Sequence, residues 1–442
     1  MLFIPEGVII LNYTFNSSTA GNDVEFCTVR AAGFKTACVS IRFSVPLARE
    51  TVSHYALVPY IITHSTKKYP SYTALEKKLA SLYGADVGVD ITKAGENQEI
   101  EISVSCIDDR FALEGESIVK NCCELLFDMV FEPNITDGAF PADETENEKR
   151  ILREQLGAEK SDKRTYARNR CEEIMCENEA FGINKYGTCE SIEAVTPQSL
   201  ADAYYELLKT ASVCVCISGS TDFEAIKKLT ADRFAALPRK VCESKTVFVK
   251  KADEVKNVKE TEPVKQGKLV MGFRLGMENE DDCYAARRVM IDLFGGSPHS
   301  KLFTVVREKM SLCYYCSARM FRKKGIMYVQ SGIETYNAQK AREAILDQLQ
   351  AIRDGEFTDE ELEYSIKSLE DSFKSVTDSP EALSAWFLSQ SSSGRYLYPD
   401  EYIAMFKAVT KQQVMQAAAE VTLDTVFMLE GSASEDDGED DE

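Results

Sequence analysis

Apolar residues alternate with polar ones on both sides of a glycine in the first half of the chain. They stand at every second position before and after Gly95: Val87, Val89 and Ile91, then Ile100, Ile102 and Val104. Strict alternation over this length is typical of half-buried β-strands. The pattern predicts two strands that are joined by a turn at Gly95.

The same arrangement recurs in the second half. A shift of 230 residues aligns four identical pairs without a gap: Ser81 with Ser311, Leu82 with Leu312, Lys93 with Lys323, and Gly95 with Gly325. After Gly325, alternate positions carry Met327, Val329 and Ser331. A helical pattern, a strand, a glycine turn and a second strand therefore occur in the same order in each half, which predicts an internal duplication.

Helical periodicity is equally regular. Thr358 and Glu361 have the spacing of a capping box, and Leu362, Ile366, Leu369 and Phe373 follow on one face. In the first half, Thr145 and Glu148 repeat that spacing ahead of Ile151, Leu152 and Leu156. Helices are therefore expected to begin at Thr145 and at Thr358.

A segment rich in charge separates the two halves. Residues 250–267 contain few large apolar side chains, and a new strand is expected over 268–275. The predicted division is an N-terminal domain over 1–239, a linker over 240–267, a C-terminal domain over 268–431 and an acidic disordered tail over 432–442. The predicted fold class is α+β, with two homologous domains, each a largely antiparallel sheet covered by helices.

Composition narrows the function. Of the 442 residues 44% are hydrophobic, and seven of the 21 net negative charges fall in the last eight positions. An acidic chain without a basic stripe does not favour nucleic acid, and no run is long enough for a membrane span. Residues 1–11 contain Pro5 and Glu6 without a basic start, unlike a secretory signal. We therefore expect a cytoplasmic protein whose 14 cysteines are reduced and serve mainly as small core residues.

Two further stretches carry a family resemblance. The first comprises Gly182, Tyr186, Gly187, Thr188, Glu190, Ser191 and Ile192; the second comprises residues 294–297, 300–303 and 307–309 with Leu312. In this order they resemble the insulinase/pitrilysin/mitochondrial-processing-peptidase family. The resemblance spans roughly residues 30–430 and implies the LuxS/processing-peptidase-like metallohydrolase fold, in which two pairs of domains close around a peptide. Residues 34–36, 46–47, 69–70 and 82–85 resemble one bacterial branch, named for an association with 5-aminopentanol modification of elongation factor P.

The resemblance also implies that a metal site has been lost. Active members carry His-x-x-Glu-His, in which the two histidines and a later glutamate hold zinc and the motif glutamate activates water. Residues 65–70 resemble the segment after this motif and place Ala56, Pro59 and Tyr60 at its three positions. Alanine cannot bind a metal, proline cannot act as a base, and a neutral tyrosine is a poor ligand. Pro59 is also expected to kink the helix, at a cost of about 3 kcal/mol.

Other candidate ligands do not restore the site. The chain has only three histidines, His54, His64 and His299, and their spacing fits neither a normal nor an inverted motif. Glu148 and Glu154 resemble the downstream glutamates of the family, although a capping role explains Glu148 equally simply. We expect no intact catalytic residue and no bound zinc in this chain, with zinc on a partner subunit instead.

The second half keeps residues that the family uses on substrate. Arg307 and Tyr314 lie seven positions apart, as do the family's arginine that holds a substrate carbonyl and its tyrosine that donates to the oxyanion. Tyr315 is the alternative to Tyr314 if the strand register differs by one residue. Gly295 and Gly296 lack the lysine of a phosphate-binding loop and are expected to form a turn that touches substrate.

Three functions remain open at this stage. The first is a catalytically inactive subunit that pairs with an active homologue carrying His-x-x-Glu-His and helps to form a peptide-processing chamber. The second is a non-proteolytic scaffold or peptide-binding protein of the same fold, as a homodimer. The third, an independent cysteine hydrolase, has the least support because no cysteine stands in a recognisable Cys/His context.

Overall fold

The computed structural model describes residues 13–242 and 244–431, so the expected acidic tail lies outside the described residues. The first sheet has six strands in the order β1 (Tyr13–Thr19), β2 (Val24–Ala31), β6 (Ser212–Gly219), β3 (Thr36–Pro46), β5 (Asn97–Ile107) and β4 (Asp86–Ala94). The second has five, in the order β7 (Lys256–Glu262), β11 (Thr422–Gly431), β8 (Gly267–Arg274), β10 (Ile326–Ile333) and β9 (Cys313–Phe321). Among the described strands, only the pairs β2–β6 and β7–β11 are parallel. The α+β fold class, with two largely antiparallel sheets, is confirmed.

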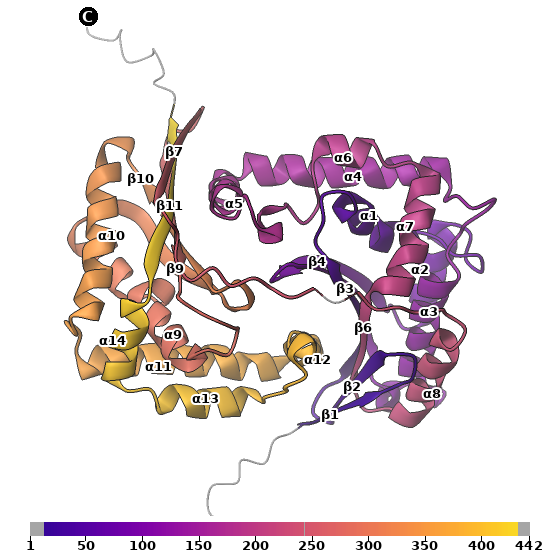
Figure 1. Cartoon of the computed structure of the whole chain (residues 1–442). Coiled ribbons are helices and arrows are strands. Elements are labelled where there is room, and N and C mark those ends of the chain that lie inside the picture. Colours follow the sequence, from indigo (N-terminus) through magenta and orange to yellow (C-terminus); the bar gives the residue numbers. More distant parts are fainter. Residues whose placement is uncertain (1–12, 243, 432–442) are drawn as a thin grey trace, which may run out of the picture.

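Helices cover one face of each sheet (Figure 1). Those of the first half are α1 (Val52–Ile62), α2 (Tyr72–Ser81), α3 (Ile118–Phe131), α4 (Ala142–Ser161), α5 (Lys163–Met175), α6 (Cys189–Glu193), α7 (Pro197–Thr210) and α8 (Phe223–Phe234). Those of the second half are α9 (Tyr284–Ile291), α10 (Ala338–Arg353), α11 (Asp359–Lys374), α12 (Pro380–Leu388), α13 (Pro399–Lys407) and α14 (Lys411–Ala419). Two π-helical segments, Asp292–Gly296 and Leu302–Lys309, lie between α9 and β9.

The repeated glycines occupy equivalent places. Gly95 joins β4 to β5 with φ +57°, and Gly325 precedes β10 after a short turn that follows β9, with φ +69°. This left-handed conformation is easy only for glycine, which explains why the two turns share it. The two tips also meet: a Cβ built on Gly95 would lie 3.0 Å from the backbone oxygen of Lys323.

One helix of each half packs against the sheet of the other half (Figure 1). Helix α5 of the first half packs on β8 and β11, through a cluster that contains Ala167, Cys171 and Met175. Helix α12 of the second half packs on β2, β3 and β6 through Leu383, Phe387 and Leu388. Both sheets are therefore covered on two sides, and the halves share apolar core.

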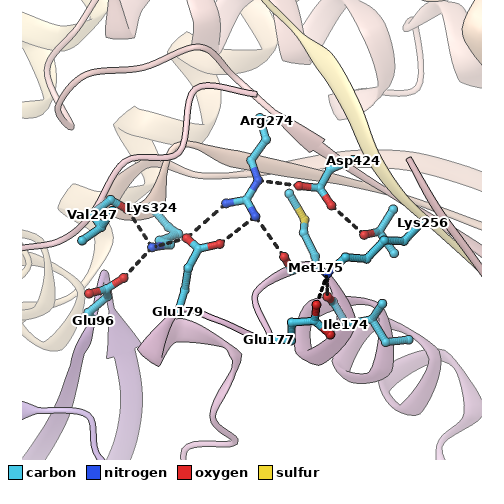
Figure 2. A network of polar contacts seen from close by, with 11 residues as sticks. Glu96, Ile174, Met175, Glu177, Glu179, Val247, Lys256, Arg274, Lys324 and Asp424 are labelled. Atoms are coloured by element: carbon cyan, nitrogen blue, oxygen red, sulfur yellow. Dashed lines mark hydrogen bonds and ion pairs between the residues drawn. The ribbon is translucent and has the colours of Figure 1, made fainter. Parts of the chain in front are cut away.

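Buried charges join the two halves at the hairpin tips (Figure 2). The Nζ atom of Lys324, whose side chain is fully buried, lies 2.7 Å from Glu96 Oε1 and 2.6 Å from Glu179 Oε2. Arg274 contacts the same Glu179 at 2.7 Å and Asp424 at 2.7 Å. Each buried cation thus has carboxylate partners, as burial of a charge requires.

Two expectations about local structure are corrected. Part of the segment predicted as a linker, Lys256–Glu262, forms edge strand β7, whose charged side chains contact α5 instead of a core; Arg170, for example, binds Glu260 at 2.8 Å. Helix α4 begins at Ala142 and not at Thr145, because the acidic first turn extends the helix back to Pro141. The Thr145 hydroxyl donates to the Pro141 carbonyl at 2.9 Å, so Thr145 and Glu148 form no capping box. The capping box at Thr358 and Glu361 is confirmed.

The cysteines behave as expected. All 14 are free thiols and ten are buried, including Cys214 and Cys216 on β6. No described helix combines the length and apolar character that a membrane span needs.

Candidate functional site

Helix α1 carries the three positions of the degenerate motif. Ala56 is fully buried and Pro59 is buried inside the helix. The helix nevertheless continues beyond Pro59 to Ile62, and the backbone N–H of Thr63 donates to the Pro59 carbonyl at 3.3 Å. The framework of the site is therefore present although the ligand-bearing side chains are absent.

Tyr60 points towards polar groups of the first half. Burial raises the pKa of its hydroxyl to about 12, and the nearby Tyr186, Asp90 and Glu148 add to this shift. A phenol held neutral by burial and by surrounding acids is a weak metal ligand. Helices α1 and α4, which carry Tyr60 and Glu148, pack against each other.

Glu148 is buried and pairs with a histidine that sequence reasoning set aside. Its Oε1 atom lies 3.4 Å from His64 Nδ1 and accepts a hydrogen bond from Asn147 Nδ2 at 3.2 Å. The contact with His64, which follows α1, arises because α4 packs beside that helix. The side chain of Glu148 is only 8% exposed. The capping explanation is therefore wrong, and Glu148 instead lies beside His64 just after α1.

Glu154 lies away from this pair. Its side chain is 64% exposed and binds Arg150 one helical turn earlier, at 2.7 Å. The structure does not bring Glu154 together with Tyr60 and Glu148.

The other two histidines are engaged elsewhere. His54 Nε2 lies 3.2 Å from Ser199 Oγ, and burial lowers the pKa of its ring. The ring of exposed His299 stacks on Tyr364, with 5.0 Å between centroids. In the described part of the chain, no set of three His, Cys, Asp or Glu side chains close enough to share an ion lies at α1. A His–Glu pair alone supplies fewer protein ligands than the three that catalytic zinc sites use.

Arg307 and Tyr314 are both placed near the start of β9. The Arg307 guanidinium lies over the Phe303 ring, 4.3 Å from its centroid. Tyr314 is 59% exposed, and its hydroxyl donates to Glu334 Oε1 at 2.6 Å. A β-bulge accounts for this exposure: Cys313 pairs with Ile333 and Tyr315 with Gly332, so Tyr314 is the additional residue.

Tyr315 has different surroundings. Its ring lies over Gly332, and the Arg164 guanidinium of α5 sits 4.3 Å from the ring centroid. Burial raises the pKa of its hydroxyl to about 12. Tyr315 is therefore held inside the contact between the two halves, whereas Tyr314 is open to solvent.

The two glycines differ in accessibility. Gly295 is buried, and an added Cβ would lie 2.7 Å from the backbone nitrogen of Ala318 on β9. Close packing of the π-helical turn against β9 thus explains this glycine, and a buried residue does not touch substrate. Gly296 is exposed and remains a candidate for substrate contact.

Comparisons with known proteins agree with this geometry. A family model described as the peptidase M16 inactive domain matches residues 194–369. The curated Bacillus subtilis (strain 168) protein "Probable inactive metalloprotease YmfF" is 28% identical over 404 residues, which cover 91% of this chain and 95% of that protein. The chain is similar to inactive members of the insulinase (M16) family.

Solved structures support the same assignment. A conserved protein from Enterococcus faecalis V583 is 28% identical, with a TM-score of 0.86, and the likeness covers 96% of this chain and 100% of that one. The periplasmic protease PqqL from Escherichia coli shares the fold at 15% identity and a TM-score of 0.71, with 95% of this chain and 48% of that chain covered. The M16 fold therefore extends over the described chain, including the second half that presents Arg307 and Tyr314.

Proposed function

We propose that this protein is the non-catalytic subunit of a peptide-processing pair, in which an active homologue supplies zinc. The proposal rests on a contrast between the two halves: the first has lost its metal ligands, and the second keeps the predicted substrate-binding residues. The α1 helix keeps its place but has no metal ligands at Ala56, Pro59 and Tyr60, whereas Arg307 and Tyr314 are present in the second half. Because a chain without a catalytic zinc site has no use for an oxyanion donor of its own, these donors would serve a zinc site on another subunit.

Accessibility supports the assignment of Tyr314. Its hydroxyl is exposed and already oriented as a donor, towards Glu334. An incoming oxyanion would compete with Glu334 for that proton, and the bulge holds the side chain away from the sheet. Preorganised donors of this kind stabilise charge that develops in a transition state.

A peptide would bind along the edge strand β4. This strand ends the first sheet and pairs only with β5 among the described strands. Helix α1 contacts β4, so the edge runs beside the helix that carries the degenerate motif. Backbone groups at a sheet edge bind extended peptides with little dependence on sequence.

The length of the E. coli protein also supports a paired arrangement. This chain corresponds to about half of that longer protein at the level of fold. A unit of this size therefore occurs within a larger chain, and a separate partner could supply the remaining part here.

The second candidate is a homodimeric scaffold or peptide-binding protein without a proteolytic role. It is favoured by the absence of three clustered ligands at α1 in the described residues. It gives no reason for the exposed Tyr314, which a scaffold does not need.

Co-expression tests the pairing. The chain is produced with a homologue that bears His-x-x-Glu-His, and the mixture is analysed by sizing with mass measurement. We expect a one-to-one complex that elutes ahead of either chain alone. A homodimer of this chain that excludes the homologue would favour the scaffold instead.

A further inference from the structure

The face of the first sheet that meets the second half carries a group of potential metal ligands. Strands β2 and β6 run parallel, with Glu25 opposite Cys214 and Cys27 opposite Cys216. Side chains two residues apart on a strand point to the same face. Glu25, Cys27 and Cys214 therefore project together, towards α12 and the loop after it.

The distances between these groups are short. Cys27 Sγ lies 3.6 Å from Cys214 Sγ and 3.7 Å from the hydroxyl of Tyr396, which comes from the second half. The Tyr396 hydroxyl donates to Glu25 Oε1. One ligand atom each from Glu25, Cys27 and Cys214 lies within 4.8 Å of the others, and no other trio in the described residues meets this condition.

We propose that Cys27, Cys214 and Glu25 bind a zinc ion, with a water held by the Tyr396 hydroxyl at the fourth position. Two thiolates and one carboxylate form a mixed sulfur and oxygen set, which zinc accepts in tetrahedral geometry. Copper(I) is selected by soft sulfur ligands and gains nothing from the carboxylate. The site is separate from α1, and the expectation of a metal-free chain rested on the α1 motif.

Apolar side chains of the second half surround the two thiols. Cys27 and Cys214 belong to an apolar cluster with Leu383 and Phe387 of α12, where polar atoms need partners. The hydrogen bond with Cys27 and burial raise the pKa of the Cys214 thiol well above its usual range. Zinc would displace the two protons and convert the thiols into thiolate ligands.

The site also has an entry route and a nearby positive charge. Cys214 lines a cavity of about 340 Å³ together with Arg42. Arg42 lies on the adjoining strand β3, directly opposite Cys214. Its guanidinium already pairs with Glu101 at 2.7 Å and with Glu99 at 3.4 Å, so it is a cation that two carboxylates share beside the site.

The consequence is a metal link between the two halves. Two cysteines and Glu25 belong to the first sheet, whereas Tyr396 follows α12. A zinc ion would hold the loop after α12 against β2 and raise the thermal stability of the whole chain, since a ligand that binds only the folded state shifts unfolding upwards.

Cobalt(II) titration of the reduced, metal-free full-length chain tests the proposal. We expect equimolar binding with the thiolate-to-cobalt absorption and the visible bands of tetrahedral cobalt, both removed by excess zinc. Cys27→Ser and Cys214→Ser should lose the thiolate band, and Glu25→Gln should weaken affinity at least tenfold. Cys123→Ser, a buried cysteine of α3, and Glu148→Gln at the degenerate motif should bind as the wild type does.

A second measurement guards against variants that fail to fold. In the unmodified chain, at a urea concentration near the unfolding midpoint, zinc should slow alkylation of buried Cys27 and Cys214 but not of exposed Cys189, as read by mass spectrometry of the peptides. Absence of a thiolate band in the wild type, or equal alkylation with and without zinc, would overturn the proposal. Neither measurement involves a partner subunit, so the outcome tests the zinc site independently of the proposed pairing.

Discussion

Lys324 Nζ lies 2.7 Å from Glu96 Oε1, and the two residues sit at equivalent hairpin tips of the duplicated halves. Glu96 follows Gly95, whereas Lys324 precedes Gly325. The buried Lys324 Nζ atom also contacts Glu179 and donates to the Val247 carbonyl (Figure 2). The duplication thus created a contact between its own two copies.

Lys324→Met should destabilise the chain strongly. The change leaves Glu96 and Glu179 buried beside an apolar side chain, and removal of one partner from a buried ion pair costs about 3 kcal/mol or more. Urea unfolding followed by circular dichroism measures the loss. Lys120→Met, at an exposed pair with Glu124, should change stability by less than about 1 kcal/mol. Equal effects of the two changes would show that the interdomain network contributes little.

Acid should weaken the same contact. Burial alone would raise the pKa of Glu179, but hydrogen bonds from Arg274 and Lys324 outweigh it and hold the pKa below its usual value of 4.5. A lowered carboxylate pKa contributes stability that is complete above the usual value and is lost as pH falls through the folded-state value. At pH values below 4.5, the urea concentration at the unfolding midpoint should therefore decrease as the pH is lowered. Glu179→Gln should make this decrease smaller. An unchanged acid slope in Glu179→Gln would assign the effect to other groups.

Much of the fold could be predicted from periodicity and two glycines, Gly95 and Gly325. Alternation around Gly95 and Gly325 located both hairpins, because a strand with one buried face leaves a direct trace in the sequence. Strand β7 was missed since its side chains meet charges on α5, so no apolar pattern marks it. The exchange of α5 and α12 between the halves could not be foreseen either, because a helix with one apolar face does not reveal which sheet it covers.

The candidate site shows the same limit. The loss of ligands at Ala56, Pro59 and Tyr60 was predicted from their residue types, once residues 65–70 had located the motif. The contact between His64 and Glu148 was not, because it depends on how α4 packs beside α1 and both residues had simpler local explanations. The exposure of Tyr314 depends on a β-bulge, which the alternation of residues along β9 does not predict.

Tyr314→Phe and Arg307→Ala should impair the paired enzyme without disrupting assembly. Loss of one oxyanion donor costs on the order of a hundredfold in kcat, so Tyr314→Phe should act mainly on kcat. Arg307→Ala should also raise KM, because its charge contributes to ground-state binding. Tyr315→Phe is the matched control: its ring lies against Arg164 inside the chain, and turnover should stay near that of the wild type. Wild-type turnover by both variants would make Arg307 and Tyr314 structural.

Cleavage between the halves should not separate them. The described residues between α8 and β7 form no helix or strand, and Lys251 there is exposed, so limited trypsin treatment should cut in this segment. The two fragments should nevertheless elute together in sizing at neutral pH, because the buried charges and the exchanged helices α5 and α12 hold them. Separate elution of intact, folded fragments would show that the halves are independent domains.

The rate of peptide cleavage by the reconstituted pair tests the central claim most directly. The rate is measured for each chain alone, for the pair, and for a pair whose partner carries Gln in place of the glutamate of its His-x-x-Glu-His motif. We predict cleavage by the intact pair, little by either chain alone, and none above background when the partner's motif is disabled. Cleavage by this chain alone, or by the pair with the disabled partner, would contradict the account.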